Sequence, residues 1–454
     1  MAKASLHQPA IPILRSTDGA ALSALLDRRP ARTPAVDRAV AAIIERVRGE
    51  GDRAVLAFAK QFDRLDGEIE VTRAEMRRAA RAVPPAVRQA IRTAAAHIRA
   101  IAARQVPRPW TIAPTPGLRI AQRVTPLDRV GCYVPGGRYP LPSSLLMTAI
   151  PAVTAGVGEV FAVCPRPDPT VMFAALEARV TRLFRLGGAH AIAALAYGTE
   201  SIPRVDKIVG PGNAYVAAAK AQVAADCAID FFAGPSEIAV VSSTGRPDWI
   251  AADLIAQAEH DPDARAILFT PVMSLALAVA HEIAAQLPAT GPAPVALRKN
   301  GGIVVSETLD ESIALSQRMA PEHVVCDSDA VARRLTRAGT VFVGPLSAQA
   351  CGDYVTGSNH VLPTSGAAAA RGGLSAADFV RVSSVQRLDR RALSRIGPSA
   401  VALAEAEGLE AHAQSVRVRL GSERGRSGVR PGSDRGQTPN RPRTDPAPTP
   451  RRRR

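Results

Sequence analysis

The chain has 454 residues, of which 46% are hydrophobic and 22% charged, and this length suffices for two to four domains with buried cores. No apolar stretch reaches the roughly 18 to 20 residues that cross a bilayer, which argues against a membrane protein. The formal net charge is +16, but ten arginines lie in the last 34 residues without aromatic residues among them, so nucleic acid is not an expected partner.

The first 110 residues predict a mainly helical layer. Apolar residues recur every three or four positions in residues 31–63 and 84–105, and Asp and Pro stand at suitable helix starts. The amino-terminal residues contain no apolar core followed by a small-residue cleavage site. We therefore expect a cytoplasmic protein without a secretory signal.

From Arg129 onward, short apolar runs that end in Gly or Pro alternate with Ala-rich helical stretches. This alternation predicts βαβ units and a parallel sheet, hence the α/β fold class, with ligands bound near strand ends. A second series of strands and helices, in residues 301–326 and 338–344, predicts a second sheet domain.

The carboxy-terminal part divides into a helix and a tail. Residues 394–420 predict one helix, preceded by a turn at Gly397 and Pro398. Residues 421–454 are rich in Gly, Pro and Arg and contain almost nothing that could bury surface. This composition predicts a disordered tail.

Four loops combine glycine with polar residues near the predicted strand ends. Glycine allows close backbone approach and positive φ, so these loops could line a ligand crevice on one sheet. None contains the G-x-G-x-x-G pattern that specifies a dinucleotide, and the alternative is a set of tight turns between strands and helices. The loops are residues 134–137, 187–190, 210–213 and 234–237.

Four polar residues are candidate metal ligands. Gln257 and His260 are three apart on a predicted helix, a spacing that suits two ligands of one metal ion and equally a pair of surface hydrogen-bonding residues. Asp353, in the polar run 351–366, is a candidate metal or substrate carboxylate. With His412 these residues would form a nitrogen and oxygen site compatible with zinc. Thiolate ligands are not expected, because the five cysteines are scattered with no CxxC pair.

Glu322 and His323 are candidate acid–base residues. They are adjacent and differ in ordinary pKa, so they offer two proton acceptors, although a polar loop ahead of a strand is the alternative. His360 is a candidate supporting residue. Glu407 and His412 lie five positions apart on the last predicted helix, so their side chains would point about 140° apart and either reach one site at the helix end or include one plain surface residue.

Together these segments resemble the histidinol dehydrogenase family. The likeness covers nearly all of residues 10–420 and depends on the order and approximate spacing of the segments. It implies an NAD-dependent, zinc-dependent oxidoreductase of histidine biosynthesis that oxidises L-histidinol to L-histidine through the aldehyde. The segments are VGCYVPGG, MTAIPA, AIAALAYGTESIPRVDKIVGPGNAYV, AGPSE, DLIAQAEHDP, APEHVV, GDYVTGSNHVLPT, GLSAADFVRVSSVQRL and EAEGLEAH.

The resemblance also implies two incomplete Rossmann-like sheet domains with small terminal helical segments. It implies a homodimer with shared active sites, in which the carboxy-terminal segment completes the partner's site, so that Glu407 and His412 act there. The expected parts are an amino-terminal segment 1–26, a discontinuous α/β domain of 27–131 and 237–374, a cofactor-side α/β domain of 132–236, a helical segment 375–420 and the tail 421–454.

Residue roles follow from the same resemblance. It implies that Glu322 and His323 are the proton acceptors. The implied ligands of one zinc ion per subunit are Gln257, His260, Asp353 and His412. The implied NAD contacts are Tyr133, His190 and Asn213. The implied substrate contacts are Ser236, Gln257, His260, Glu322, His323, Asp353, Glu407 and His412.

Two places depart from the family pattern. The family usually carries glutamine at the position of His190, which can form a hydrogen bond through one ring nitrogen but can also become charged. The loop Gly136–Tyr139 is similar to relatives that oxidise other alcohols, including sulfonated propanediols. The alternative function is therefore a related zinc- and NAD-dependent alcohol dehydrogenase for another polar hydroxylated substrate, whereas Ser236-Glu237 and the EAEGLEAH segment resemble the biosynthetic members.

Overall fold

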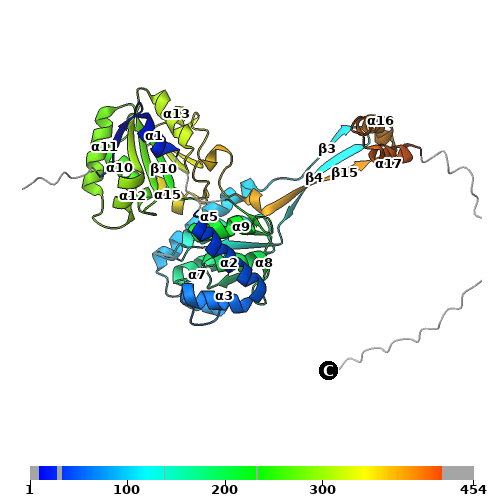
Figure 1. Ribbon diagram of the computed structural model, residues 1–454, viewed down its shortest axis with the longest axis horizontal. Helices are drawn as coiled ribbons and strands as arrows, with labels where there is room; N and C mark the ends of the chain where they lie inside the picture. The colour runs from blue at the N-terminus through cyan, green and yellow to red at the C-terminus, as the bar shows by residue number, and fades with distance from the viewer. Residues whose placement is uncertain (1–9, 28–32, 137–138, 232–233, 422–454) are drawn as a thin grey trace, which may run out of the picture. The chain divides into compact units, whose positions relative to one another are not determined.

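A computed structural model describes residues 10–27, 33–136, 139–231 and 234–421. The chain divides into two compact units, one of Met1–Arg108 with Val124–Val382 and one of Pro109–Arg123 with Ser383–Arg454. The first unit contains two six-stranded sheets, which confirms the α/β fold class (Figure 1). Within the described ranges, no helix is both long and apolar enough to cross a membrane.

One sheet of the first unit has the strand order β2-β7-β6-β5-β8-β9. All neighbours are parallel except β2 and β7. The inner strands are almost continuously apolar, as expected where helices cover both faces of a parallel sheet. The strands are β2 (Glu70–Val71), β5 (Arg129–Tyr133), β6 (Glu159–Val163), β7 (Arg182–Phe184), β8 (Lys207–Val209) and β9 (Ala228–Ile229).

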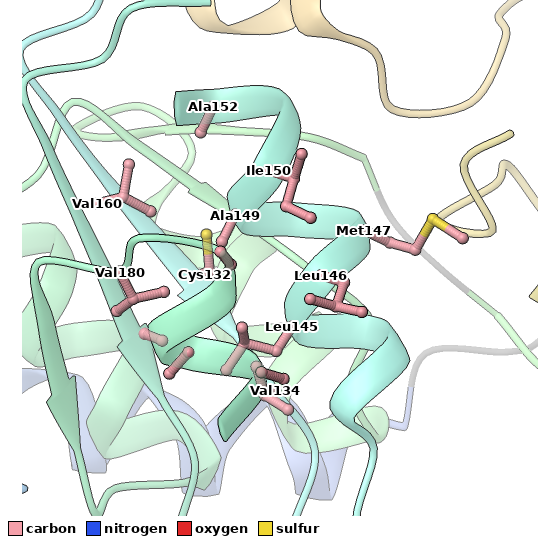
Figure 2. Packing of buried hydrophobic residues seen from close by; sticks show 14 of the residues in the cluster. Cys132, Val134, Leu145, Leu146, Met147, Ala149, Ile150, Ala152, Val160 and Val180 are labelled. Atoms are coloured by element: carbon pink, nitrogen blue, oxygen red, sulfur yellow. The ribbon is translucent and has the colours of Figure 1, made fainter. Parts of the chain in front are cut away.

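Helices cover both faces of this sheet. Figure 2 shows how α6 places Leu145 and Ala149 beside Cys132 of β5, and such fully buried side chains each contribute about 1.5–3 kcal/mol when large. One face carries α4 (Arg73–Ala80), α5 (Pro85–Gln105), α6 (Pro142–Thr154) and α7 (Pro169–Glu177). The other carries α2 (Pro34–Glu50), α3 (Asp52–Phe58) with the π-helical turn η1 (Ala59–Asp63), α8 (Gly188–Tyr197) and α9 (Ala214–Val223).

The second sheet is entirely parallel, with the order β1-β12-β11-β10-β13-β14. Its strands are β1 (Ile13–Arg15), β10 (Glu237–Val241), β11 (Arg265–Thr270), β12 (Gly301–Val305), β13 (His323–Cys326) and β14 (Thr340–Val343). One face packs on α10 (Pro247–Ala258), α11 (Met273–Gln286) and α12 (Pro292–Asn300). The other packs on α1 (Gly19–Leu26), α13 (Leu309–Met319) and α14 (Asp329–Ala332). After β14 follow α15 (Gln349–Tyr354), η2 (Ala367–Ala369) and η3 (Ala376–Phe379).

The packing groups the amino-terminal residues differently from the expected domains. Residues 34–105 cover the sheet of β5 to β9 instead of joining residues 237–374, because the apolar faces of α2 and α5 pack against that sheet and its helices. Strand β5 also crosses the expected boundary between residues 131 and 132. Strand β1, from the expected amino-terminal segment, is the edge strand of the second sheet.

The second unit is built from a three-stranded sheet and two helices. The expectation of a single helix over 394–420 is wrong: α16 ends at Ala406, and Gly408 adopts a φ of +73° that stops it. Pro398 lies inside α16 instead of at a turn. The expected helical segment 375–420 also contains a nine-residue strand. The elements are β3 (Trp110–Thr115), β4 (Leu118–Pro126), β15 (Val380–Leu388), α16 (Arg390–Ala406) and α17 (Glu410–Leu420).

Candidate active site

Glu322 and His323 lie where β13 begins, beside the first residue of β10. The parallel register aligns His323 with Ile238, so Glu322 lies next to Glu237. Both candidate acid–base side chains are buried, with 5% and 3% of their surface exposed. Glu322 lies in a bend directly ahead of the strand, where the alternative places a polar loop, but both side chains are buried instead of exposed to solvent.

The Glu322 carboxylate is held by the protein backbone. Its Oε2 accepts a hydrogen bond of 2.9 Å from the backbone N–H of Glu237. Burial raises the pKa of Glu322 well above its ordinary value, and the nearby negative charges of Glu237 and Asp353 raise it further. A carboxyl group in this state is a stronger base than an exposed one.

The His323 ring has a defined tautomer. Its Nδ1 lies 3.2 Å from the carbonyl oxygen of Glu237, and because a carbonyl only accepts, Nδ1 carries the hydrogen. Its Nε2 lies 3.9 Å from Oδ1 of Asp353. Burial lowers the pKa of His323 to about 4, so the ring is neutral at pH 7 with a free lone pair on Nε2.

Asp353, on α15, connects three polar side chains. Its Oδ2 accepts a hydrogen bond of 2.8 Å from the amide of Gln349 and lies 3.7 Å from Nε2 of His260. Burial raises the pKa of Asp353, but His260, His323 and His360 together outweigh this effect and hold it below its ordinary value. Asp353 is therefore a carboxylate at neutral pH, and the interaction with this carboxylate raises the pKa of His260.

Gln257 and His260 do not share a helix as expected. Helix α10 ends at Ala258, four residues before Pro262, which has no N–H to bond to the carbonyl of Ala258 in a continued helix. The Gln257 side chain is fully buried, and neither its Oε1 nor its Nε2 has a hydrogen-bond partner among the described residues. A buried amide in this state costs about 1–3 kcal/mol unless something satisfies it.

These donors suit a cation, although no three His, Cys, Asp or Glu side chains of the described residues are arranged as a metal site. The set here contains the unsatisfied amide oxygen of Gln257, the ionised carboxylate of Asp353 and the imidazole of His260. Nitrogen and oxygen donors of this kind are ligands of zinc and of related divalent ions. The residues present therefore fit a metal ion.

The fourth expected ligand belongs to the other unit. His412 lies on α17, and Glu407 directly follows α16, with Gly408 between the two helices. The expected angle of about 140° between their side chains therefore does not apply, because it assumed one continuous helix.

A small cavity of about 50 Å³ lies beside Glu322. Ser236, an expected substrate contact, lines it together with Gly210 and His360. His360 is fixed by its Nδ1, which donates to the carbonyl oxygen of Asp353 at 2.9 Å, and burial lowers its pKa. The cavity thus joins one candidate proton acceptor to a hydroxyl and an imidazole.

Of the three expected cofactor residues, Tyr133 ends β5, while His190 and Asn213 follow β7 and β8; the carboxyl ends of these strands share one sheet edge. The Tyr133 hydroxyl accepts a hydrogen bond of 3.1 Å from the backbone N–H of Gly188. Asn213 caps α9 through Oδ1. His190 is 1% exposed, and its Nε2 lies 2.8 Å from Oδ2 of Asp63, which also accepts the backbone N–H of Gly187.

The glycine loops are shared between the two sheets. Residues 134–136, 187–190 and 210–213 follow strands of the sheet that contains β5, whereas residues 234–237 lead into β10 of the other sheet. The expectation that all four loops lie on one sheet is therefore wrong. The cavity nevertheless brings Gly210 of one loop and Gly234 and Ser236 of another to the same place.

The family model of histidinol dehydrogenase matches residues 26–420. The chain belongs to the histidinol dehydrogenase family. It is 47% identical over 413 residues to histidinol dehydrogenase of Caulobacter vibrioides, covering 88% of this chain and 96% of the relative. It is 48% identical over 397 residues to the Geobacillus kaustophilus protein of that name, covering 84% and 93%. The crystal structure of histidinol dehydrogenase from Elizabethkingia anophelis aligns with a TM-score of 0.87 at 33% identity, covering 92% of this chain and 99% of that one.

These similarities confirm the expected family and support oxidoreductase activity in histidine biosynthesis. The alternative, a dehydrogenase of sulfonated or other alcohols, gains no support, because the relatives at 45–48% identity are named histidinol dehydrogenases. Gly137 and Arg138, which prompted that alternative, lie outside the described residues.

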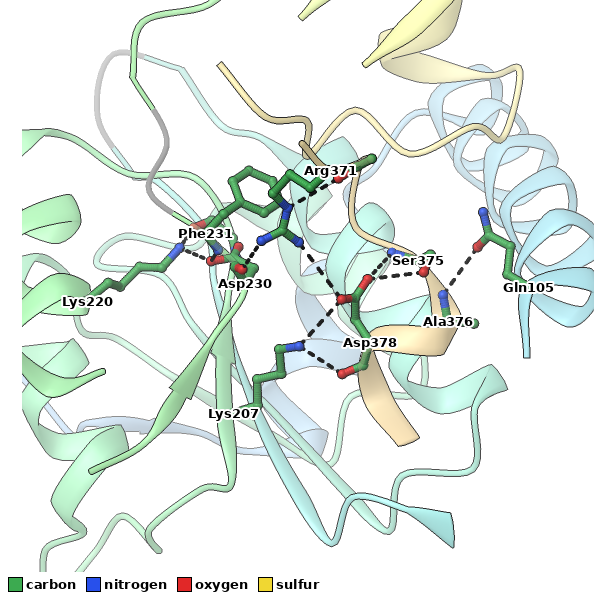
Figure 3. A network of polar contacts seen from close by, with 11 residues as sticks. Gln105, Lys207, Lys220, Asp230, Phe231, Arg371, Ser375, Ala376 and Asp378 are labelled. Atoms are coloured by element: carbon green, nitrogen blue, oxygen red, sulfur yellow. Dashed lines mark hydrogen bonds and ion pairs between the residues drawn. The ribbon is translucent and has the colours of Figure 1, made fainter. Parts of the chain in front are cut away.

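Sequence reasoning missed a buried charge network in this histidinol dehydrogenase family member. Lys220 and Asp230 form an ion pair with side chains 3% and 1% exposed, and Lys220 also donates to the carbonyl oxygen of Gly210 (Figure 3). Arg371 stacks on Phe231 and donates to the carbonyl oxygen of Asp230. Gly210, Asp230 and Phe231 line the cavity, so the network fixes part of its wall. The sequence feature that could have indicated the network is a charged residue inside each of the apolar runs AYVAAAKAQV and AIDFF.

Proposed function

We propose that the chain oxidises L-histidinol to L-histidine through the aldehyde, with two NAD, one water and zinc, in the cytoplasm. The observation that carries the proposal is the buried pair of Glu322 and His323, both bonded to the backbone of Glu237. Two proton acceptors are needed, because the alcohol proton leaves in the first half-reaction and a water proton leaves in the second.

His323 accepts the alcohol proton as hydride leaves the adjacent carbon. Its Nδ1–H is occupied by the Glu237 carbonyl, so Nε2 is the accepting atom. The ring is neutral because burial lowers the pKa of His323 to about 4. Oδ1 of Asp353, 3.9 Å from Nε2, would stabilise the imidazolium that forms.

Glu322 removes a proton from the water that adds to the aldehyde carbon. The backbone N–H of Glu237 orients the carboxylate, and burial raises the pKa of Glu322, so the protonated product is favoured in this environment. Ser236, in the same cavity, would contact the substrate.

Gln257, His260 and Asp353, with His412, would hold zinc. The fit is supported by the unsatisfied buried amide of Gln257 and by the ionised Asp353. Zinc, when bound there, would supply a Lewis acid that helps to orient the substrate. We expect Gln257→Ala and His260→Ala to lower the zinc content of the purified protein, whereas His281→Ala, an exposed histidine on α11, keeps it. Unchanged zinc in both ligand variants would refute the assignment.

NAD would bind at the carboxyl edge of the sheet that contains β5. Tyr133 and Asn213 stand at the ends of β5 and β8, where ligands of open α/β sheets bind. His190 would act at this place through Asp63 and the loop at Gly187, since its Nε2 is bonded to Asp63.

Glu407 and His412 would complete the active site of a second subunit in a homodimer. Mixing His260→Ala with His412→Ala subunits tests this directly, because each mixed dimer would contain one site with both histidines intact. Recovery of activity after verified subunit exchange is the expected result. If exchange occurs and activity stays absent, the sites are not shared.

The reaction itself is tested by counting NADH. Zinc-loaded protein given L-histidinol should form close to two NADH per substrate, and chelation should abolish turnover until zinc is restored. Glu322→Gln should keep its zinc and slow mainly the water-dependent second half-reaction. Folded, zinc-bound protein that forms no NADH with L-histidinol would refute the proposed function.

A further inference from the structure

The backbone of Glu237, the first residue of β10, contacts the side chains of both candidate proton acceptors. Its N–H donates to Oε2 of Glu322 at 2.9 Å, and its carbonyl oxygen accepts Nδ1–H of His323 at 3.2 Å. The position of this one residue therefore sets where the Glu322 carboxylate lies and which nitrogen of His323 is free. The mechanism gives no role to the side chain of Glu237.

That side chain forms a buried ion pair. Its Oε1 lies 3.0 Å from Nη1 of Arg265, and the two side chains are 1% and 7% exposed. Arg265 begins β11 directly opposite Glu237 in the parallel register. Nη2 of Arg265 donates to the carbonyl oxygens of Leu25 and Leu26 at the end of α1. The pair thus ties the start of β10 to a neighbouring strand and to a helix on the sheet's face.

Stability alone does not account for such a pair. Two charges lose their hydration on burial, and apolar residues of similar volume often stabilise a core equally well or better. Burial raises the pKa of Glu237, while Arg265 and the backbone amides of Ser365 and Glu322 oppose this rise. Unlike an apolar contact, an ion pair between a carboxylate and a guanidinium restricts both the distance and the angle between the two groups.

We propose that the Glu237–Arg265 ion pair is a positioning device for the acid–base residues, which fixes the backbone of Glu237 and thereby orients Glu322 and His323. The inference rests on the proposed function, because it assumes that these two residues move the protons. A shift of β10 by about 1 Å would lengthen both backbone hydrogen bonds beyond their normal range, and misplacement on that scale can cost about 100-fold in rate.

The decisive variant replaces both charges by apolar residues of similar size, Glu237→Leu with Arg265→Met. No charge is then buried without a partner, so the protein should keep its thermal unfolding midpoint within a few degrees. We expect kcat with L-histidinol to fall about 10- to 100-fold while KM changes less than about threefold. The matched control is Glu70→Leu with Arg182→Met, an Arg–Glu pair between adjacent strands of the other sheet, which should leave kcat unchanged.

A second readout does not depend on turnover. In protein labelled with ¹⁵N-histidine, the His323 signal, assigned by its loss in His323→Gln, should report a single Nδ1–H tautomer in the unmodified chain. In the Leu–Met double variant it should shift towards a mixture of tautomers. A double variant with normal unfolding, kcat within about threefold and an unchanged tautomer would overturn the inference. If the unmodified chain forms no NADH, the proposed function fails, while the tautomer shift still decides the positioning role.

Discussion

Replacing Gly210 with alanine should lower the free energy of unfolding more than the same substitution at a glycine with open surroundings, because Gly210 forms part of the cavity wall. Gly210 follows β8 with a φ of +115°, and an added Cβ would lie 2.2 Å from the carbonyl oxygen of Tyr133. Its N–H donates to Oδ2 of Asp230 at 2.8 Å, and its carbonyl oxygen accepts from Nζ of Lys220 at 3.1 Å. The residue is therefore held on both sides by buried charges, and the backbone of Tyr133 at the end of β5 leaves no room for a Cβ.

The magnitude follows from these contacts. An alanine at this φ costs about 1–3 kcal/mol in backbone strain. The contact of 2.2 Å must open by roughly 1 Å, because Cβ atoms essentially never approach another atom within 3.0 Å. That movement weakens the bonds to Asp230 and Lys220, and a hydrogen bond to a charged group contributes about 1.5–3 kcal/mol. Strain and one lost bond together give about 2.5–6 kcal/mol.

Gly291 supplies the control for backbone strain. It has a φ of +102°, and nothing lies within 4 Å of its added Cβ. Gly291→Ala should therefore lose only the strain, about 1–3 kcal/mol. Urea unfolding of both variants measures the difference, and titration with NAD measures whether the wall has moved. Equal losses of stability in the two variants would refute the reasoning.

Three further predictions concern charge and metal. Burial raises the pKa of Asp253 to about 6, so its stabilising contribution is complete below pH 3.8 and is lost as the pH rises through 6. Asp253→Asn should therefore be more stable than the unmodified protein at pH 8, by at most about 3 kcal/mol. In unfolding curves measured near pH 4 this difference should vanish. Lys220→Met should destabilise by about 3–5 kcal/mol in chemical denaturation, because Asp230 is left buried without its partner, and a loss below 1 kcal/mol would contradict this. Adding zinc should raise the unfolding midpoint of the unmodified protein but not that of His260→Ala, in parallel calorimetric scans.

From residue 129 onward, the sequence predicted the strands of the two six-stranded sheets because their signals are local, but it did not predict β3, β4 or β15. Each apolar run that ends in Gly or Pro, from residue 129 to residue 270, contains a strand of one of the two sheets. The placement of residues 34–105 was not predictable in the same way. An apolar stripe every 3.6 residues shows that α2 and α5 cover something, but both sheets offer apolar faces, and only long-range packing decides between them.

In the candidate site, the sequence alone could pair only residues that are neighbours in the chain. Glu322 and His323 are neighbours in the chain, so their pairing needed no knowledge of the fold. The shared helix of Gln257 and His260 was expected from spacing, yet α10 ends at Ala258 ahead of Pro262. The prediction of a shared helix was wrong because the residues after Ala258 form a turn.

The buried ion pairs show a different limit. A charged residue in an apolar run, such as Glu237 ahead of IAVV or Lys220 within α9, indicates that a partner must exist, because an unpaired buried charge is too costly. The partner's identity depends on strand register: Glu237 meets Arg265 because β10 and β11 are parallel and begin together, 28 positions apart in the chain. A register shift of β11 by one residue would turn Arg265 to the opposite face and separate it from Glu237, so the ion pair depends on a strand pairing that no local pattern specifies.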